Sequence, residues 1–254
     1  MTEHVSRNNS VEKGLQILEC FTHAHPFLTL EEIVKMTGFP KTTTFRLIKS
    51  LETYGYLRSN QRFKESQYSL GWVFLSKGNL VLSQLNIRDM AHDEMVDLRN
   101  KTGQTVQLAI RDRDEAVYIE QIESLKPIQL YPQVGRKAPL YAAACPRVLL
   151  ASLTENEQDR VLSDIDFKTY TRIPKVEKLK EELERVKVNG YAISYGELHE
   201  GTIAIASPIL TKDNQAVAAI SVAGLEKDFE NGHLETCIDL VKTAAQRLTM
   251  KLKF

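Results

Sequence analysis

The stretch that most constrains the fold is residues 29–56, TLEEIVKMTGFPKTTTFRLIKSLETYGY, which predicts two helices joined at a tight break. Thr29 suits the N-cap of the first helix, and Glu32 stands three residues later, as a capping box requires. Gly38 supplies the turn, and Pro40 opens the second helix with a φ angle that suits a first helical turn. The second helix places its core positions at i, i+3, i+4 and i+7: Thr44, Leu47, Ile48 and Leu51. The stretch therefore predicts a helix-turn-helix.

The other sides of the second helix are mostly polar and cationic. They carry Lys41, Thr42, Thr43, Phe45, Arg46 and Lys49. Three consecutive threonines suit a merely solvated helix poorly, because β-branched side chains lose χ1 freedom there. Short hydroxyl donors and acceptors at a helix N-terminus do suit contact with phosphates and base edges. An ordinary helical hairpin is the alternative interpretation of this stretch taken alone.

The residues after the second helix predict a β-hairpin. A short strand begins at residues 56–58, residues 59–65 form a polar turn, and residues 67–70 alternate as a returning strand does. Arg62 and Lys64 lie at the tip. Residues 40–64 hold six lysines and arginines against one glutamate, the charge excess expected of a surface that neutralises a phosphate backbone. A cationic hairpin directly after such a helix is typical of a winged helix-turn-helix.

Charge divides the chain into two parts. Residues 1–70 carry nine Lys and Arg against seven Asp and Glu, whereas the remainder carries 24 against 26. Nucleic acid, if bound, is therefore expected at the N-terminal part. With 254 residues, of which 43% are hydrophobic, the chain is long enough for two domains with a sizeable core.

Several classes of protein are disfavoured. Cys20, Cys145 and Cys237 are odd in number and far apart, which argues against a disulfide framework and for a reducing cytosol. The histidines show no metal-ligand spacing, so we expect no metal and no cofactor. No apolar run approaches the roughly 18 residues of a membrane span, and the N-terminus lacks the apolar core of a signal peptide. These observations predict a cytoplasmic protein without a membrane partner.

Three segments organise the chain. A helix over about residues 11–21 completes a domain over residues 1–70, and residues 71–86 predict a linker helix with a weak point at Gly78. If Trp72 and Phe74 are exposed in the monomer, we expect a partner to cover them. An α+β domain with a mainly antiparallel sheet is predicted over residues 87–254.

The last domain mixes helices and strands without a strict βαβ repeat. Helices are predicted over residues 87–101, 146–152, 155–163 and 175–188 and at the C-terminus, and strands over 105–110, 116–122, 128–134, 191–194, 202–210 and 216–222.

At this point the residues carry a family resemblance over nearly all of the chain. The supporting stretches are PKTTTFRLIKSLETYGYL, QYSLG, GRKAPLYAAACPRVLLA, NGYAISYGELHEGTIAIASPIL and AAISVAG. In this order and spacing they resemble the IclR family of bacterial transcriptional regulators. The resemblance implies a winged-helix domain, a linker helix and a GAF-like effector-binding domain. It also implies a homodimer or a dimer of dimers that represses, or sometimes activates, genes for the use of small organic acids or sugar acids.

The effector site is expected around the small apolar run 138–144 and the helix start that follows it. Free N–H groups at a helix start are ready donors for a carboxylate. In the family the corresponding turn lies on the effector pocket, so the resemblance implies Ala144 and Cys145 as backbone donors, while Pro146 replaces the family's usual glycine and removes one N–H. Ala138 is placed at the same site. Ser221 matches a serine that contacts the effector in glyoxylate- and pyruvate-responsive members of the family.

Three other positions depart from those members. Ser194 stands in place of an aspartate, Ala204 in place of a cysteine and Ala223 in place of a serine. A ligand larger than a small 2-oxo acid is therefore expected. The alternative is that Ala204 and Ala223 are simply core residues on inward strand faces.

Two motifs have competing interpretations. The segment AISYG at Ser194 resembles a degenerate nucleophile elbow, but a strand rather than a helix is predicted after it, which disfavours a hydrolase with His199 and Glu197 as partners. The run from Glu197 to Gly201 matches the family and favours an architectural or pocket-edge role. Cys145 is either a redox-sensing thiol at a helix start or, more commonly, a packed small hydrophobe.

The sequence thus predicts a ligand-responsive DNA-binding regulator that is not an enzyme. Thr42, Thr43 and Arg46 are expected to contact bases or phosphates, and Phe45 a thymine methyl group. Arg62 and Lys64 on the wing and Arg7 in the N-terminal arm are expected at the DNA backbone or minor groove. A symmetric dimer implies a near-palindromic operator. The competing classes are a small-molecule enzyme with a helical N-terminal domain and a pure interaction protein.

Overall fold

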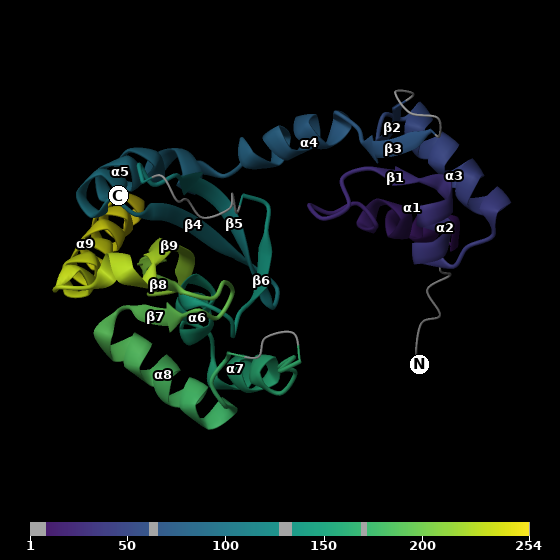
Figure 1. The fold of residues 1–254 in the computed structure, drawn as a ribbon. Coiled ribbons are helices and arrows are strands. Elements are labelled where there is room, and N and C mark those ends of the chain that lie inside the picture. The colour runs from purple at the N-terminus through teal and green to yellow at the C-terminus, as the bar shows by residue number, and fades with distance from the viewer. Residues whose placement is uncertain (1–8, 61–65, 127–133, 169–171, 254) are drawn as a thin grey trace. The chain divides into compact units, whose positions relative to one another are not determined.

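The computed structural model describes residues 9–60, 66–126, 134–168 and 172–253 (Figure 1). By internal contacts the chain divides into two compact units, Met1–Gln84 and Leu85–Phe254. We call them the head and the body and describe each by itself. The segment predicted as the linker helix belongs to the head, apart from its last two residues.

The helix-turn-helix prediction is confirmed in the head, which contains α1 (Asn9–Glu19), α2 (Leu30–Thr37) and α3 (Lys41–Thr53). The Thr29 side chain accepts the Glu32 N–H, and the Glu32 carboxylate accepts the Thr29 N–H at 2.7 Å, so the capping box is complete. Gly38 ends α2 with a φ of 71°, a left-handed conformation that glycine adopts without steric cost. Pro40 then stands at the N-cap of α3.

The apolar sides of the three helices form one core with the sheet of the head. Its buried members are Ile17, Cys20, Phe21, Leu28, Ile33, Ile48, Leu57 and Tyr68. Of the predicted core positions on α3, Thr44 and Ile48 are fully buried, while Leu47 and Leu51 are partly buried against the same core. Thr44 is tolerated there because its hydroxyl donates to the Pro40 carbonyl at 3.2 Å.

The predicted hairpin is present as β2 (Leu57–Asn60) and β3 (Gln67–Leu70), paired antiparallel. A strand that the sequence analysis did not predict, β1 (Leu28–Thr29), pairs with the other edge of β3 and gives the order β1-β3-β2. Two residues are too few to show an alternating pattern, so this strand has no signal of its own in the sequence.

Helix α4 (Val73–Leu82) follows the wing and buries none of its residues within the chain. Trp72, just before it, is 70% exposed, and the Arg58 guanidinium lies 4.6 Å from the centre of its ring. Phe74 packs edge-on against Tyr56 at 5.5 Å and is still 38% exposed. Trp72 and Phe74 are therefore both exposed in the monomer, which is the condition under which a partner is expected to cover them.

The body is built on six antiparallel strands in the order β6-β5-β4-β9-β8-β7. The strands are β4 (Thr105–Asp112), β5 (Glu115–Ile122), β6 (Lys137–Pro139), β7 (Ala192–Tyr195), β8 (Thr202–Leu210) and β9 (Ala216–Leu225). The strand expected over residues 128–134 falls, except for Val134, outside the described residues, and Val134 itself is in a turn. The mainly antiparallel α+β prediction is confirmed.

Helices pack on both faces of this sheet (Figure 1). They are α5 (Asn86–Thr102), α6 (Ala144–Ala151), α7 (Glu155–Leu162), α8 (Val176–Asn189) and α9 (His233–Lys253). Residues alternate between the faces along each strand. One face, which we call the α6 face, places Ala109, Ala206 and Ala219 in a single buried cluster with α6. Helices α5 and α9 pack together and against β8, β9 and β4 on the other face.

Alanine substitution of two glycines in the head shows how tightly its backbone segments are packed. A Cβ atom on Gly71 would lie 1.9 Å from the Gly55 carbonyl oxygen, whereas one on Gly78 would meet nothing within 4 Å. We expect Gly71→Ala to lower the free energy of unfolding of the head by about 3 kcal/mol, because two backbone segments must separate. The control, Gly78→Ala, should raise it by about 0.5–1 kcal/mol, since alanine favours the helix.

Urea unfolding followed by the fluorescence of Trp72, the chain's single tryptophan, would measure both effects. Equal unfolding midpoints for the two variants would contradict the close approach of Gly71 to Gly55.

Candidate functional site

Helix α3 presents the predicted DNA-binding side chains on its exposed sides. Lys41, Thr42, Phe45, Arg46 and Lys49 are exposed, whereas Thr43 is only partly so. Two of the cations already have partners within the head: Lys41 pairs with Glu31 of α2, and Lys49 with Glu52 at 2.7 Å.

Arg46 is different, because no ion pair or hydrogen bond of its guanidinium is found among the described residues. Exposed ion pairs such as Lys41–Glu31 contribute little stability and can be exchanged for phosphate contacts. Arg7, Arg62 and Lys64 lie outside the described residues, so their placement stays a prediction.

In the body, the start of α6 already has hydrogen-bond acceptors from the chain itself. The Ala144 N–H donates to the Ser194 hydroxyl oxygen at 3.2 Å, and the Ala143 N–H donates to a Glu197 carboxylate oxygen at 2.9 Å. Ala143, the N-cap of α6, has a φ of 72°, which is rare for a residue with a Cβ atom. This backbone conformation sets the direction of the N–H groups at the start of α6. Sequence reasoning identified the Ala144 N–H as a donor, together with that of Cys145, but identified neither the Ala143 N–H nor the two acceptors.

Glu197 also neutralises a buried arginine. The Arg147 side chain is 1% exposed and contacts both Glu197 oxygens, at 2.7 and 2.8 Å. It lies 3.1 Å from a Glu182 oxygen of α8 and donates to the carbonyls of Ile193 and Tyr141. A bidentate pair of this kind combines charge with fixed geometry. Arg147 therefore connects α6, α8, β7 and the segment after β7.

The strand register brings most of the predicted effector residues into two transverse rows on the α6 face. In the first row, Ser194 of β7 lies opposite Ala204 of β8, and Ala204 lies opposite Ala223 of β9. In the second, Ala206 of β8 lies opposite Ser221 of β9, which lies opposite Gln107 of β4. The expected small residues are therefore neighbours in space, although they are up to 29 positions apart in the chain.

The second row continues from Gln107 of β4 to Gln121 of β5, and sequence reasoning identified neither of these amides. Gln107 lies opposite Gln121, and the Gln107 amide donates to the Gln121 amide oxygen at 3.0 Å. Gln107 is 6% exposed. A polar residue at an inward position of a predicted strand was the available signal, but alternation alone does not tell which face of a two-sided sheet it occupies.

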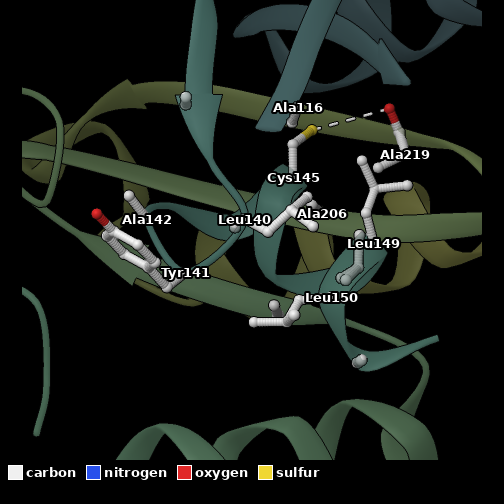
Figure 2. Close-up of a cluster of buried hydrophobic side chains, with 14 of the residues drawn as sticks. Ala116, Leu140, Tyr141, Ala142, Cys145, Leu149, Leu150, Ala206 and Ala219 are labelled. Atoms are coloured by element: carbon white, nitrogen blue, oxygen red, sulfur yellow. Dashed lines mark hydrogen bonds between the residues drawn. The ribbon is translucent and has the colours of Figure 1, made fainter. Parts of the chain in front are cut away.

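Cys145 packs between α6 and the sheet (Figure 2). Its thiol lies 3.8 Å from the Ala219 carbonyl oxygen. Burial raises the pKa of the thiol to about 12, and a hydrogen bond with the Ser221 side chain offsets only part of that rise. The thiol is therefore protonated at neutral pH, which favours the packed interpretation of Cys145 over the redox-sensing one.

Ala138 occupies a different part of the body. It pairs with Ala116 between β6 and β5, three strands away from Ser221, and is 1% exposed in the cluster beneath α6. The structure thus places Ala138 in the same buried cluster as Ala144 and Cys145, but on a strand distant from Ser194, Ser221 and Ala223.

The segment around Ser194 lacks the geometry of a nucleophile elbow. Ser194 lies within β7, and the next regular element is strand β8 rather than a helix. Its expected partners are engaged elsewhere, Glu197 with Arg147 and His199 with Arg136. The sequence-based preference against a hydrolase agrees with this arrangement.

The described residues contain no group of three or more His, Cys, Asp and Glu side chains able to hold a metal ion together. None of the helices in this part of the chain has the length and apolar character to cross a membrane.

The buried pair gives a stability prediction. We expect Glu197→Gln to lower the free energy of unfolding of the body by about 3 kcal/mol, because the Arg147 charge would stay buried without its main partner. The control is Glu200→Gln, three residues away, whose exposed carboxylate pairs with exposed Arg172 and should cost at most about 1 kcal/mol. Urea unfolding followed by circular dichroism measures both, and equal losses would contradict the assigned role of Glu197.

Known proteins resemble this chain over nearly its whole length. "HTH-type transcriptional regulator KipR" of Bacillus subtilis is 38% identical over 98% of the chain and 99% of its own length. "HTH-type transcriptional regulator XynR" of Escherichia coli is 31% identical over 96% of the chain and 97% of its own length. The crystal structure of an IclR transcriptional regulator from Alicyclobacillus acidocaldarius has a TM-score of 0.81 at 27% identity, covering 96% of this chain and 98% of that one.

Two family descriptions match in the same order as the two units. Residues 10–61 match the IclR helix-turn-helix domain, and residues 79–250 match the C-terminal domain of the bacterial transcriptional regulator IclR. The head and the body each carry the corresponding fold. The chain therefore belongs to the IclR family of bacterial transcriptional regulators and is a DNA-binding regulator of transcription.

Proposed function

We propose that α3 reads the operator from the major groove and that the body adjusts this binding in response to a small acidic effector. The observation that carries the proposal is the exposed side of α3, where Thr42, Arg46 and Lys49 stand clear of the core that Thr44 and Ile48 fill. Phosphate contacts by Lys41 and Lys49 would set the register, and Thr42, Thr43, Phe45 and Arg46 would contact bases. Arg7, Arg62 and Lys64 would add contacts to the backbone or minor groove.

The regulator is proposed to act as a homodimer or a dimer of dimers. Helix α4 supports this, because Leu75, Leu80 and Val81 are each about 60% exposed, and Trp72 beside them is 70% exposed. An apolar surface of this kind is usually covered by a partner. A two-fold dimer would place two copies of α3 about 34–36 Å apart, or a multiple of that, and would read a near-palindromic site.

The effector is proposed to bind beside the start of α6, against the two rows on the α6 face. Its contacts would include Ser194, Ser221 and the helix start at Ala144 and Cys145, with space left by Ala204 and Ala223. Neutral hydroxyls and amides in these rows suit a hydroxylated organic acid or sugar acid larger than a 2-oxo acid. We propose repression in the cytoplasm as the output, without turnover of the ligand.

Two other classes of protein would give different results in these assays. An enzyme with a helical N-terminal domain would consume a bound acid, which a product assay detects. A pure interaction protein would bind neither DNA nor any small acid.

The DNA-binding proposal is tested by fluorescence anisotropy with a fragment from upstream of the protein's own gene, a shuffled fragment and two salt concentrations. The wild type should bind the real fragment more tightly, with affinity that falls as salt rises. Arg46→Ala should lose about 1–3 kcal/mol of preference for the real fragment without changing the oligomeric state. The control is Arg185→Ala, an exposed arginine of α8 in the body; equal affinity in the wild type and Arg46→Ala would remove Arg46 from the interface.

The effector proposal is tested with Ser221→Ala in the same assay, after a screen of organic and sugar acids for release of the fragment. We expect about a tenfold higher acid concentration for half-release, because one buried hydrogen bond to the ligand is lost. Ser207→Ala is a matched control, since Ser207 is equally buried on β8 but donates to the Gly190 carbonyl. A normal response in Ser221→Ala together with a shifted one in Ser207→Ala would contradict the placement.

A further inference from the structure

An acidic ligand beside α6 needs a cationic or N–H partner, and the helix start offers few. Ser194 and Glu197 already accept the N–H groups of Ala144 and Ala143. Pro146 has no N–H to give, which leaves the Cys145 N–H of the donors expected there. The Arg147 charge is neutralised by Glu197. The carboxylate of an effector would therefore have to compete with the protein's own groups at the position where sequence reasoning placed it.

Arg136 offers a different cation on the same face. It precedes β6, and its carbonyl accepts the Tyr118 N–H of β5 at 3.0 Å. Ala138, two residues later, faces α6, so alternation directs Arg136 to the α6 face as well. Its charge also reaches the Tyr118 hydroxyl: burial raises the pKa of Tyr118, and Arg136 opposes that rise.

The Arg136 side chain connects the two edges of the sheet. Its guanidinium lies 2.7 Å from the His199 Nε2, and His199 lies between β7 and β8. Since β6 and β7 are the two edge strands of the sheet, this contact links opposite edges across the α6 face. Burial and the Arg136 charge both lower the pKa of His199, so the imidazole is neutral at pH 7 and serves as an uncharged acceptor.

A neutral acceptor is a weaker partner for a guanidinium than a carboxylate is. A carboxylate adds the attraction of a full opposite charge and accepts two parallel N–H···O bonds from a guanidinium, whereas His199 offers one ring nitrogen. An incoming carboxylate is therefore favoured over His199 at Arg136. Ser221, Gln107 and Gln121 form the polar row on the same face and can pair with hydroxyl groups.

We propose that Arg136 binds the carboxylate of a hydroxylated acid in exchange for His199, while the amides of Gln107 and Gln121 bind hydroxyl groups of the same molecule. This inference rests on the proposed effector site and names the residues that select its ligand. It differs from a purely structural role, in which the Arg136–His199 contact only holds the two edges of the sheet together.

The two roles make opposite predictions for His199. If the contact is only a brace, removing either side chain should harm ligand binding alike. If His199 competes with the ligand for Arg136, His199→Ala should bind the acid as tightly as the wild type or more tightly. Arg136→Gln should bind it at least about tenfold more weakly, and Arg136→Lys should recover part of the loss.

The experiment uses the full-length protein with tartrate, gluconate and galactarate, each beside its neutral polyol. Thermal shift identifies the acids that stabilise the wild type, and isothermal titration calorimetry of the best acid gives affinities for the wild type and the three variants. Stabilisation by an acid but not by its polyol, weaker binding in Arg136→Gln and undiminished binding in His199→Ala would support the proposal.

Three results would overturn it: no stabilisation by any of the acids, equal affinity in Arg136→Gln, or weaker binding in His199→Ala. The titration reads ligand binding to the body and needs no DNA. A failure of the regulator proposal would instead appear as absent operator binding in the anisotropy assay, so the two failures are distinguishable.

Discussion

The charge of Arg147 must be neutralised inside the body, and that requirement ties together elements that are distant in the sequence. The side chain is 1% exposed, so the pair with Glu197 is made where water cannot replace either partner. Because Glu197 also accepts the Ala143 N–H, one carboxylate both neutralises Arg147 and holds the start of α6. The position of α6 over the sheet, and with it the buried cluster of small residues, depends on this contact.

The same contact changes how the start of α6 can be used. A helix N-terminus is a ready anion site only while its N–H groups are free. Here one internal carboxylate and one hydroxyl accept the N–H groups of Ala143 and Ala144, so an acidic ligand must displace them, rely on the Cys145 N–H, or find a cation elsewhere on the α6 face. The structure offers Arg136 for the second route, where a neutral imidazole is among the competing partners. Exchange at Arg136 leaves Arg147 neutralised, whereas exchange at Glu197 does not.

The sequence predicted the local features well, but it did not predict which residues distant in the chain contact one another. The capping box at Thr29, the turn at Gly38 and the periodicity of α3 all have signals within one or two helical turns, and each is present. The positions Ala204, Ser221 and Ala223 came from the family resemblance, because β8 and β9 are buried on both faces and alternation does not distinguish them. The partner of Arg147, the Gln107–Gln121 pair and the link from Arg136 to His199 join residues 14 to 63 positions apart, and no periodicity encodes such contacts. Strand β1 was not predicted for a different reason: its two residues are too few to show an alternating pattern.

The segment between β7 and β8 is where ligand and scaffold meet. It carries Glu197, which holds α6, and His199, which contacts Arg136, only two residues apart. A ligand can shift an equilibrium only by binding its two states with different affinity. If an acid takes the place of His199, the segment loses its contact with Arg136 and keeps the one between Glu197 and Arg147, so the body acquires a second arrangement that the ligand alone favours. The strong Arg147–Glu197 pair then preserves the fold, while the weaker Arg136–His199 contact is the one that can change.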